Sequence, residues 1–303
     1  IPDQEVLENI DIGGPTMLRA AAKNHPAVTV VVDPADYAWV ADRFEKGGTS
    51  AEERHALAAI AFAHVSFYDS IIASWLRGPG NTFPKEMTVG VRRVAELRYG
   101  ENPHQKAALY ADAPKTGGVV GADQLHGKEL SYNNILDADA AWRSANEFSE
   151  QAVSIIKHTN SCGLAVDEDQ AEAFRKAFAG DPVSAYGGIV GFNRPVTSRA
   201  VEALRKVFFE VIVAPGYEPE ALEALQKKRD IRVLLVPPYG GGPRLEPTLQ
   251  MRRVSGGLLF QSSDTLDEDS EGWKVVTDRA PTQMEMRDLV FAWKAAKHIK
   301  SNT

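Results

Sequence analysis

The sequence contains a single cysteine, Cys162, among its 303 residues. One thiol excludes an internal disulfide framework and any metal site built from several cysteines, and it suits a reducing cytoplasm. No apolar run approaches the roughly 20 residues that cross a bilayer, and no signal peptide is visible. The motifs HExxH, GxxxxGK[ST] and GxSxG do not occur, so zinc-protease, NTPase and α/β-hydrolase functions lose their usual support.

Basic residues are also fewer than acidic ones, and the chain carries a formal net charge of −7. This balance argues against a nucleic-acid-binding surface as the main function, although it leaves room for a local basic pocket. The content of 44% hydrophobic and 25% charged residues is typical of a soluble globular protein. The first residue is Ile1 rather than Met, so we expect a processed or trimmed piece of something longer.

Two regions are expected on either side of the Gly- and Pro-rich segment 78–84, with a domain boundary at residue 80. In the first region, Pro15 near a first turn predicts a helix, and the β-branched run Val28–Val32 predicts a strand. A long helix is expected from the capping box at Ser50 to Gly78. Its predicted buried stripe includes His64, which is then more naturally a core histidine than a catalyst. That stripe is Leu57, Ile60, His64, Phe67, Tyr68, Ile71 and Trp75.

The second region alternates strands and helices, which predicts an α/β sheet with crossover helices. One predicted strand begins with residues 87–91, and the others are 153–156, 189–192, 211–214 and 231–236. The predicted helices are 137–148, 169–178, 198–209, 219–228 and one starting at the capping box Thr282–Glu285. Segments 237–247 and 264–271 are predicted loops.

The most informative stretch is KHTNSCG, residues 157–163, directly after the apolar run 153–156. Strand ends in open α/β sheets are where ligands bind, and His158 can move protons near neutral pH. The adjacent Lys157 can hold the imidazole neutral or hold an anionic substrate. The alternative is an exposed Lys-His dipeptide at a strand terminus, and this segment alone does not decide between them.

Three other clusters could carry chemistry. The stretch 98–105 offers Arg98 for phosphate or carboxylate and Tyr99 for stacking, or is simply a polar loop. Segment 131–134 offers amides at a helix N-terminus, or ordinary capping. The small-residue loop 181–188 can bring backbone amides close to a ligand, but taken alone this signal is no more specific than that of any Gly-Gly loop.

Taken in chain order, these segments resemble one family. The ordered motifs are DIGGPTMLRAAAKNH, RYGENPHQ, LSYNNILDADAAW, KHTNSCG, DPVSAYGGIVGFNR, VIVAPGY and FAWKAAKHIKSN. They are similar to the bifunctional purine-biosynthesis enzymes that join 5-aminoimidazole-4-carboxamide ribonucleotide (AICAR) formyltransferase to inosine monophosphate (IMP) cyclohydrolase. The resemblance runs nearly end to end.

The resemblance implies site residues in both parts. In the formyltransferase it implies Lys157, His158 and Asn302 as catalytic residues. Nucleotide or folate contacts are implied for Arg98, Tyr99, His104, Asn134, Ser184, Ala185, Tyr186, Gly187 and Glu210. In the cyclohydrolase it implies catalytic Asp11 and Lys23, with the backbone of Gly13 and Gly14 near the purine.

The resemblance further implies substrates, partners and folds. The substrates are AICAR, its formylated product FAICAR and 10-formyltetrahydrofolate, in a cytoplasmic homodimer with sites at the interface, without nucleic acid or membrane. The implied folds are a partial methylglyoxal-synthase-like domain at 1–80, then cytidine-deaminase-like α/β subdomains without zinc at 81–303. It also allows a potassium ion near the segment that ends at Thr303. Because Cys162 is the single cysteine, the sequence independently disfavours a deaminase-type zinc site, which needs a cluster of cysteines or of cysteines with His.

The sequence departs from the family pattern at Ser161, where many members have Pro, and at both ends. The first cyclohydrolase elements have no counterpart before Ile1, and the chain stops right after Asn302. The chain therefore looks like the middle of a longer polypeptide. A non-catalytic nucleotide-binding relative, a truncated product or a nucleoside deaminase-like enzyme are the alternative functions, and the Lys157–His158 pair argues against the first.

Overall fold

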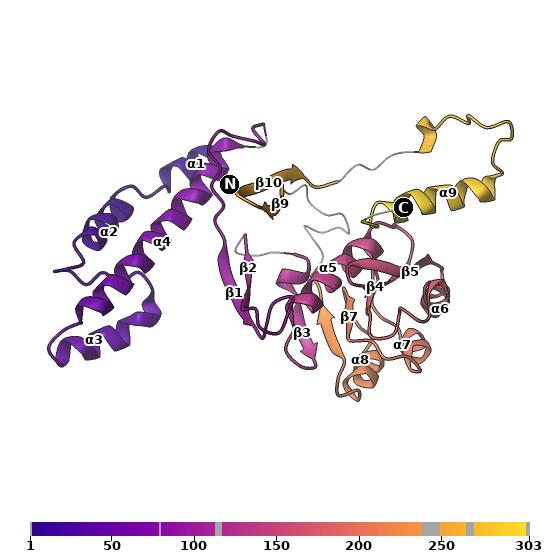
Figure 1. Cartoon of the computed structure of the whole chain (residues 1–303), viewed down its shortest axis with the longest axis horizontal. Helices are drawn as coiled ribbons and strands as arrows, with labels where there is room; N and C mark the ends of the chain where they lie inside the picture. The colour runs from indigo at the N-terminus through magenta and orange to yellow at the C-terminus, as the bar shows by residue number, and fades with distance from the viewer. Residues whose placement is uncertain (1, 79, 113–116, 238–248, 265–269, 301–303) are drawn as a thin grey trace. The chain divides into compact units, whose positions relative to one another are not determined.

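The computed structural model describes residues 2–78, 80–112, 117–237, 249–264 and 270–300. The chain divides into two compact units, Ile1–Arg92 and Arg93–Thr303. Each unit is described by itself below, and its elements are labelled in Figure 1.

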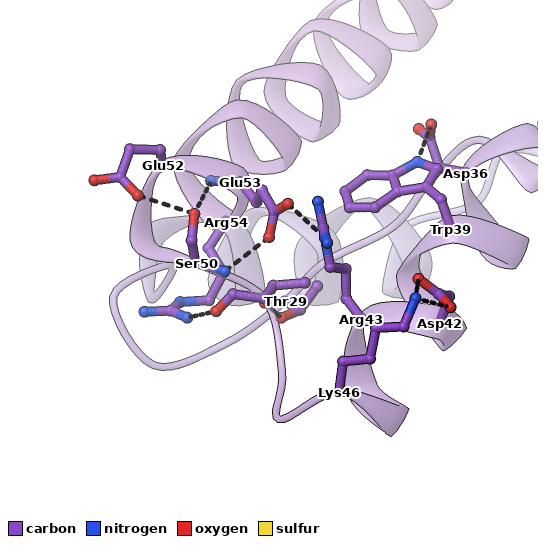
Figure 2. A network of polar contacts seen from close by, with 11 residues as sticks. Thr29, Asp36, Trp39, Asp42, Arg43, Lys46, Ser50, Glu52, Glu53 and Arg54 are labelled. Atoms are coloured by element: carbon purple, nitrogen blue, oxygen red, sulfur yellow. Dashed lines mark hydrogen bonds and ion pairs between the residues drawn. The ribbon is translucent and has the colours of Figure 1, made fainter.

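The described part of the first unit is helical. It comprises α1 (Asp3–Glu8), α2 (Gly13–Lys23), the short 3₁₀ turn η1 (Pro34–Asp36), α3 (Tyr37–Glu45) and α4 (Ala51–Arg77). The capping box expected at Ser50 is confirmed: its hydroxyl accepts the Glu53 amide at 3.2 Å, and the Glu53 carboxylate accepts the Ser50 amide at 2.8 Å (Figure 2). Such reciprocal bonds satisfy donors that the first helical turn leaves free. Gly78 ends the helix at a φ of 62°, as expected.

The run Val28–Val32 forms no strand, contrary to the sequence prediction. A strand needs a hydrogen-bonded neighbour, and none of the described residues supplies one. The segment is held by side chains instead. Arg54 donates to the carbonyls of His25 and Pro26 at 2.9 and 3.0 Å, and the hydroxyls of Thr29 and Thr49 lie 2.7 Å apart.

Helix α4 buries a different face from the predicted stripe. Leu57, Ala58, Ala61 and Val65 are buried, whereas Ile60 and the expected core residue His64 are exposed. The buried face is rotated by about one residue, or roughly 100°, from the predicted one. Because α4 is apolar around most of its circumference, spacing alone did not select the side that packs on α2.

Helix α4 is also long and apolar enough, by length and composition, to cross a membrane. It is the one such helix among the described residues, and the sequence analysis overlooked it. The observation is weak evidence, because the core helix of a soluble protein passes the same test. The buried small residues of α4 pack in a cluster with Ala22 and Val30 of the same unit.

The second unit is built on a six-stranded mixed sheet in the order β3-β8-β7-β6-β4-β5. Its strands are β3 (Asp123–His126), β4 (Ala152–Lys157), β5 (Asn160–Val166), β6 (Ile189–Phe192), β7 (Val211–Ala214) and β8 (Arg232–Leu235). Strands β6, β7 and β8 are parallel, whereas β3, β4 and β5 run antiparallel to their neighbours. An α/β fold is therefore confirmed.

Helices cover both faces of this sheet. Helix α5 (Tyr132–Asn146) packs Ala138, Ala141 and Trp142 against Ile156, Ile189 and Val211 on one face. The other face carries α6 (Gln170–Gly180), α7 (Ser198–Leu204) and α8 (Pro219–Gln226). At roughly 25 cal/mol per Å² of apolar surface removed from water, these two layers are the main stabilising feature of the unit.

The remaining elements lie outside the sheet. They are β1 (Arg92–Leu97) paired with β2 (Ala107–Ala111), β9 (Leu249–Val254) paired with β10 (Gly257–Ser262), α9 (Gln283–Ala296), and the short 3₁₀ turns η2 (Val119–Gly121) and η3 (Ser270–Gly272). The strand predicted to begin with residues 87–91 begins later, at Arg92. The helix predicted at 198–209 ends early, at Leu204. Most of the predicted loops 237–247 and 264–271 lie outside the described residues.

Candidate active site at a sheet edge

Strand register sets a row of backbone positions along one edge of the sheet. Ile156 pairs with Ile189, Ile189 with Val211, and Val211 with Arg232. The residues just outside these pairs, among them Lys157 and Glu210, therefore share an edge, about 10 Å apart because neighbouring strands are ~4.8 Å apart. Since β4 is antiparallel to β6, this is the edge where the parallel strands begin. The rule that ligands bind beyond the carboxyl ends of parallel strands, from which the sequence predicted a site here, therefore does not apply to this edge.

The Lys-His stretch forms a tight hairpin between β4 and β5. His158 and Thr159 make the turn with φ of 54° and 60°. Two successive positive φ values define the turn type whose twist matches paired strands, but Asn-Gly is its usual sequence. A β-branched residue such as Thr159 is strained there, by roughly 1–3 kcal/mol. The turn expected after the Lys-His pair is therefore only two residues long, and Ser161–Gly163 belong to a strand.

The Asp137 carboxylate holds this strained turn in place. It accepts the amide of His158 at 3.2 Å and the amide of Thr159 at 2.6 Å. Asp137 lies on α5, which packs on the sheet face beside β4. The His158 side chain is exposed, and its imidazole has no hydrogen-bond partner in the described part of the chain. An imidazole fixed at its backbone and open at its ring suits proton transfer to a bound ligand.

Lys157 points toward the loop that precedes β6. Its ammonium donates to the carbonyl of Tyr186 at 2.9 Å. Within that loop the Asp181 carboxylate accepts the amides of Val183 and Ser184 at 3.1 and 2.9 Å. Hydrogen bonds from Ser184 lower the pKa of Asp181, and nearby Lys157 lowers it further. The structure therefore brings Ser184, buried Ala185, exposed Tyr186 and Gly187, whose φ is 73°, next to the Lys-His hairpin.

Asn134 and Glu210 meet at the same edge. Asn134 completes a capping box with Ser131 at the start of α5, so the ordinary capping role is confirmed. Its side-chain amide also donates to the Glu210 carboxylate at 2.8 Å. Arg232, almost fully buried, lies 3.9 Å from the same carboxylate. An amide, a carboxylate and a guanidinium thus converge beside the hairpin, as a polar ligand requires.

The loop 98–105 is attached to the start of α5. The side chain of Asn133 donates to the Glu101 carbonyl at 3.2 Å. The Arg98 guanidinium lies over the Tyr99 ring at 4.8 Å. His104 is exposed in the same loop. Gln105, which the sequence analysis did not single out, closes the loop by accepting the Asn102 amide at 2.8 Å.

The end of helix α9 reaches the hairpin as well. Lys300 donates to the Thr159 hydroxyl at 3.0 Å. Upstream, Lys297 and His298 each lie 3.0 Å from the Glu147 carboxylate. Burial alone raises the pKa of Glu147, but hydrogen bonds from His298 and Lys297 outweigh it and lower that pKa. Asn302, the third expected catalytic residue, lies outside the described residues.

The expected cyclohydrolase residues all lie in the first unit. Asp11 caps α2 by accepting the amide of Gly14 at 3.0 Å. A Cβ atom on Gly14 would lie 2.2 Å from that carboxylate, which explains the glycine; Gly13 begins the helix. Lys23 is the last residue of the 11-residue helix α2, which is about 16 Å long, and Asp11 precedes its first residue, so the two lie at opposite ends of the helix. The structure does not bring these two side chains together.

Cys162 is not equipped to act as a nucleophile. It is the extra residue of a bulge, because Ile155 pairs with Gly163 and Ile156 with Ser161. Burial raises the pKa of its thiol, and Asp181 raises it further. A thiol with a raised pKa stays protonated at neutral pH and is unreactive. Among the described residues there is no group of three or more His, Cys, Asp or Glu that could hold a metal ion.

Sequence reasoning missed three residues that organise the site. Asp137 fixes the hairpin, Arg232 approaches Glu210, and Lys300 contacts Thr159. Asp137 could have been singled out from the sequence, since it lies in the same helix as Asn134. Its contact with a residue 21 positions away required the fold.

Together, fold and site define a class: an α/β protein that presents a lysine and a histidine on a sheet edge beside polar loops. Comparison with known proteins narrows this class. The chain belongs to the AICARFT/IMPCHase bienzyme family, which it matches over residues 21–303.

Curated relatives are similar throughout the chain. It is 48% identical over 301 residues to the bifunctional purine biosynthesis protein PurH of Thermoanaerobacter sp. (strain X514), and 50% identical over 302 residues to that of Listeria welshimeri. The PurH of Mycobacterium marinum is 48% identical over 309 residues. These matches cover 98–99% of this chain but 58% of each relative. The chain thus spans somewhat more than half the length of the proteins it resembles.

Proposed function

We propose that this chain carries the formyl-transfer site of a bifunctional purine-biosynthesis enzyme, together with part of its cyclohydrolase domain. The observation that carries the proposal is the Lys157–His158 hairpin, strained and pinned by Asp137, within a chain that belongs to this family. The substrates are AICAR and 10-formyltetrahydrofolate, and the product FAICAR is then closed to IMP.

The chemistry makes sense of these residues. The 5-amino group of AICAR is a poor nucleophile, because its lone pair is delocalised into the imidazole and the carboxamide. It attacks the formyl carbon of the folate, so that a new C–N bond forms while the bond from that carbon to folate N10 breaks. His158 removes the amine proton, directly or through the carboxamide. Lys157 stabilises the oxyanion and protonates the departing N10.

Other residues bind and orient the two substrates. Arg98 binds the 5′-phosphate, since its guanidinium suits bidentate contact with phosphate oxygens. Asn134 reads the carboxamide, and Glu210 reads the amino-pyrimidine part of the pterin. Tyr186 and the backbone of Gly187 line the space between nucleotide and folate. Asn302 positions the formyl group or His158.

The same proposal covers the cyclohydrolase part and the assembly. Asp11 and Lys23 polarise the formyl oxygen and shuttle protons during loss of water. Residues 1–80 form part of a methylglyoxal-synthase-like domain, and residues 81–303 form cytidine-deaminase-like subdomains that need no zinc. The enzyme is a cytoplasmic homodimer. The potassium ion suggested near Thr303 falls outside the described residues, and no step here depends on it.

The test is a calorimetric titration of the chain with AICAR, paired with a formyl-transfer assay using 10-formyltetrahydrofolate. Binding with turnover supports the proposal. Binding without turnover indicates a nucleotide site that lacks part of its catalytic machinery. If AICAR does not bind at all, the proposal is wrong for this chain.

A further inference from the structure

The loop that joins β1 to β2, residues 98–106, is held together by its own hydrogen bonds. Its tip is the four-residue turn Asn102–Gln105, in which the amide of Gln105 donates to the carbonyl of Asn102 at 3.0 Å. Pro103 stands at the second position of this turn, where its fixed φ is favoured. The local sequence therefore sets the turn, but the turn does not by itself close the rest of the loop.

Gln105 closes the rest of the loop. Its side-chain oxygen accepts two hydrogen bonds from Asn102, one from the backbone amide at 2.8 Å and one from the side-chain amide at 3.1 Å. Its carbonyl accepts the amide of Gly100 at 2.8 Å. Gly100 is buried, and a Cβ atom on it would lie 2.9 Å from the Cβ atom of Gln105. Gln105 thus fixes both the tip of the loop and the backbone at Gly100.

The residues next to Gly100 are the ones that face a ligand in the proposed function. Arg98 lies with its guanidinium 4.8 Å from the centre of the Tyr99 ring and donates to the Tyr99 hydroxyl at 3.2 Å. It forms no ion pair with any residue that the structure describes. Because a guanidinium carries five N–H donors, most of those on Arg98 are left for an anion. The bond from Asn133 to the carbonyl of Glu101 attaches the loop to the start of α5.

We propose that Gln105 is a positioning residue for the recognition of the substrate's 5′-phosphate. This inference rests on the proposed function, in which Arg98 binds that phosphate. Gln105 does not touch the ligand. It fixes the backbone at Gly100, and through it the stacked pair of Arg98 and Tyr99, before the ligand arrives. A loop that is ordered in advance loses less conformational entropy on binding, so the phosphate contributes more to the affinity.

The experiment measures binding of two probes to the full chain by calorimetry: AICAR, and its riboside, which has the same base and ribose but no phosphate. The ratio of the two affinities isolates the contribution of the phosphate. Gln105→Met has a side chain of similar length without the amide oxygen. We expect it to lower this ratio about tenfold, as for the loss of one hydrogen bond to a charged group, and to leave the affinity for the riboside unchanged.

Two further variants serve as controls. Gln105→Glu keeps an oxygen that can accept both hydrogen bonds from Asn102. We expect its ratio to stay within about threefold of the wild-type value, because one added exposed charge has a modest effect. Gln261→Met makes the same substitution in the β9–β10 hairpin, where the exposed Gln261 side chain donates to Gln250 at 2.8 Å, and should leave the ratio unchanged.

The failures of the inference and of the proposed function can be told apart. If Gln105→Met lowers both affinities by the same factor, Gln105 only stabilises the fold and the inference is wrong. It is also wrong if the ratio does not change, or if Gln105→Glu lowers the ratio as much as Gln105→Met. In each of these cases the wild-type chain still binds AICAR, and the proposed function stands. If the wild-type chain binds neither probe, the proposed function fails together with the inference.

Discussion

At the scale of single residues, Asp137 connects the fold to the chemistry. Two consecutive non-glycine residues with positive φ cost free energy, and the site persists only if its surroundings impose that geometry. Asp137 does so because its carboxylate accepts two hydrogen bonds, and a bond to a charged group typically contributes about 1.5–3 kcal/mol. The same hydrogen bonds fix the backbone position from which the His158 side chain extends.

Replacing Asp137 should therefore weaken both the hairpin and the site. We expect Asp137→Ala to lower the free energy of unfolding by about 2 kcal/mol, less than the sum for two such bonds because the turn is partly exposed and water replaces the carboxylate, and to speed amide exchange at His158 and Thr159. Adding Thr159→Gly should return about 1 kcal/mol, because glycine adopts positive φ without strain. Urea unfolding and hydrogen exchange measure these effects. If the changes in the free energy of unfolding caused by Asp137→Ala and Thr159→Gly are strictly additive, Asp137 does not restrain the turn.

Some residues of the candidate site could be predicted from the sequence, and others could not. Lys157, Asn134 and Glu210 were singled out and do meet at one edge. His64 was placed in the core but is exposed, because α4 is apolar on several sides and spacing could not select the packed one. The contacts of Arg232 with Glu210 and of Lys300 with Thr159 join distant segments, and no local pattern signals them.

At the scale of elements, strands flanked by turn residues were predicted closely. The bounds of β6 and β7 match the apolar runs 189–192 and 211–214. Val28–Val32 has equal strand propensity but no partner among the described residues, so propensity alone misled. Strand β5 was missed because His158-Thr159 lacks the glycine or asparagine that normally marks a two-residue turn.

The contact between β5 and α6 is unusually close. A Cβ atom on Gly163 would lie 1.7 Å from the carbonyl oxygen of Ala177. We expect Gly163→Ala to lower the free energy of unfolding by about 3 kcal/mol or more, since α6 would have to move. Gly257→Ala is the control, because nothing lies within 4 Å of its Cβ position. Equal effects of the two substitutions in urea unfolding would contradict this packing.

Docking of α9 should depend on pH through Glu147. The folded protein lowers the pKa of this carboxyl below its ordinary value of 4.5, so its contribution is fully present above pH 4.5 and is lost as pH falls through the lowered pKa. Glu147→Gln should reduce hydrogen-exchange protection in α9 at neutral pH and flatten this pH dependence. Asp288→Asn, on the exposed side of α9, serves as the control. Unchanged protection in Glu147→Gln would show that packing such as the Phe148–Phe291 stack suffices.

At the scale of the whole molecule, the two units differ in their cores. Among the described residues of the first unit, seven hydrophobic side chains are buried, three of them alanines. The second unit encloses its sheet between two helical layers. Apolar burial dominates stability, so we expect the first unit to lose hydrogen-exchange protection at lower denaturant concentration than the second. Loss of protection in both units at the same concentration would show that they unfold together.

Nearly all of this chain matches its relatives, but it corresponds to 58% of their length. The substrate binding that we propose for Arg98, Asn134 and Glu210 can be measured separately from turnover. The two readouts together separate an assembled pocket from a complete catalytic site.

The central claim is that the Lys157–His158 hairpin performs formyl transfer with His158 as the base. The most direct test compares the wild-type chain with His158→Ala, measuring AICAR affinity by calorimetry and the rate of formyl transfer from 10-formyltetrahydrofolate at saturating substrates. The account predicts that affinity changes little, while the rate falls by roughly 10²–10³. Loss of affinity with turnover of bound AICAR preserved would contradict it, and would make His158 a binding residue.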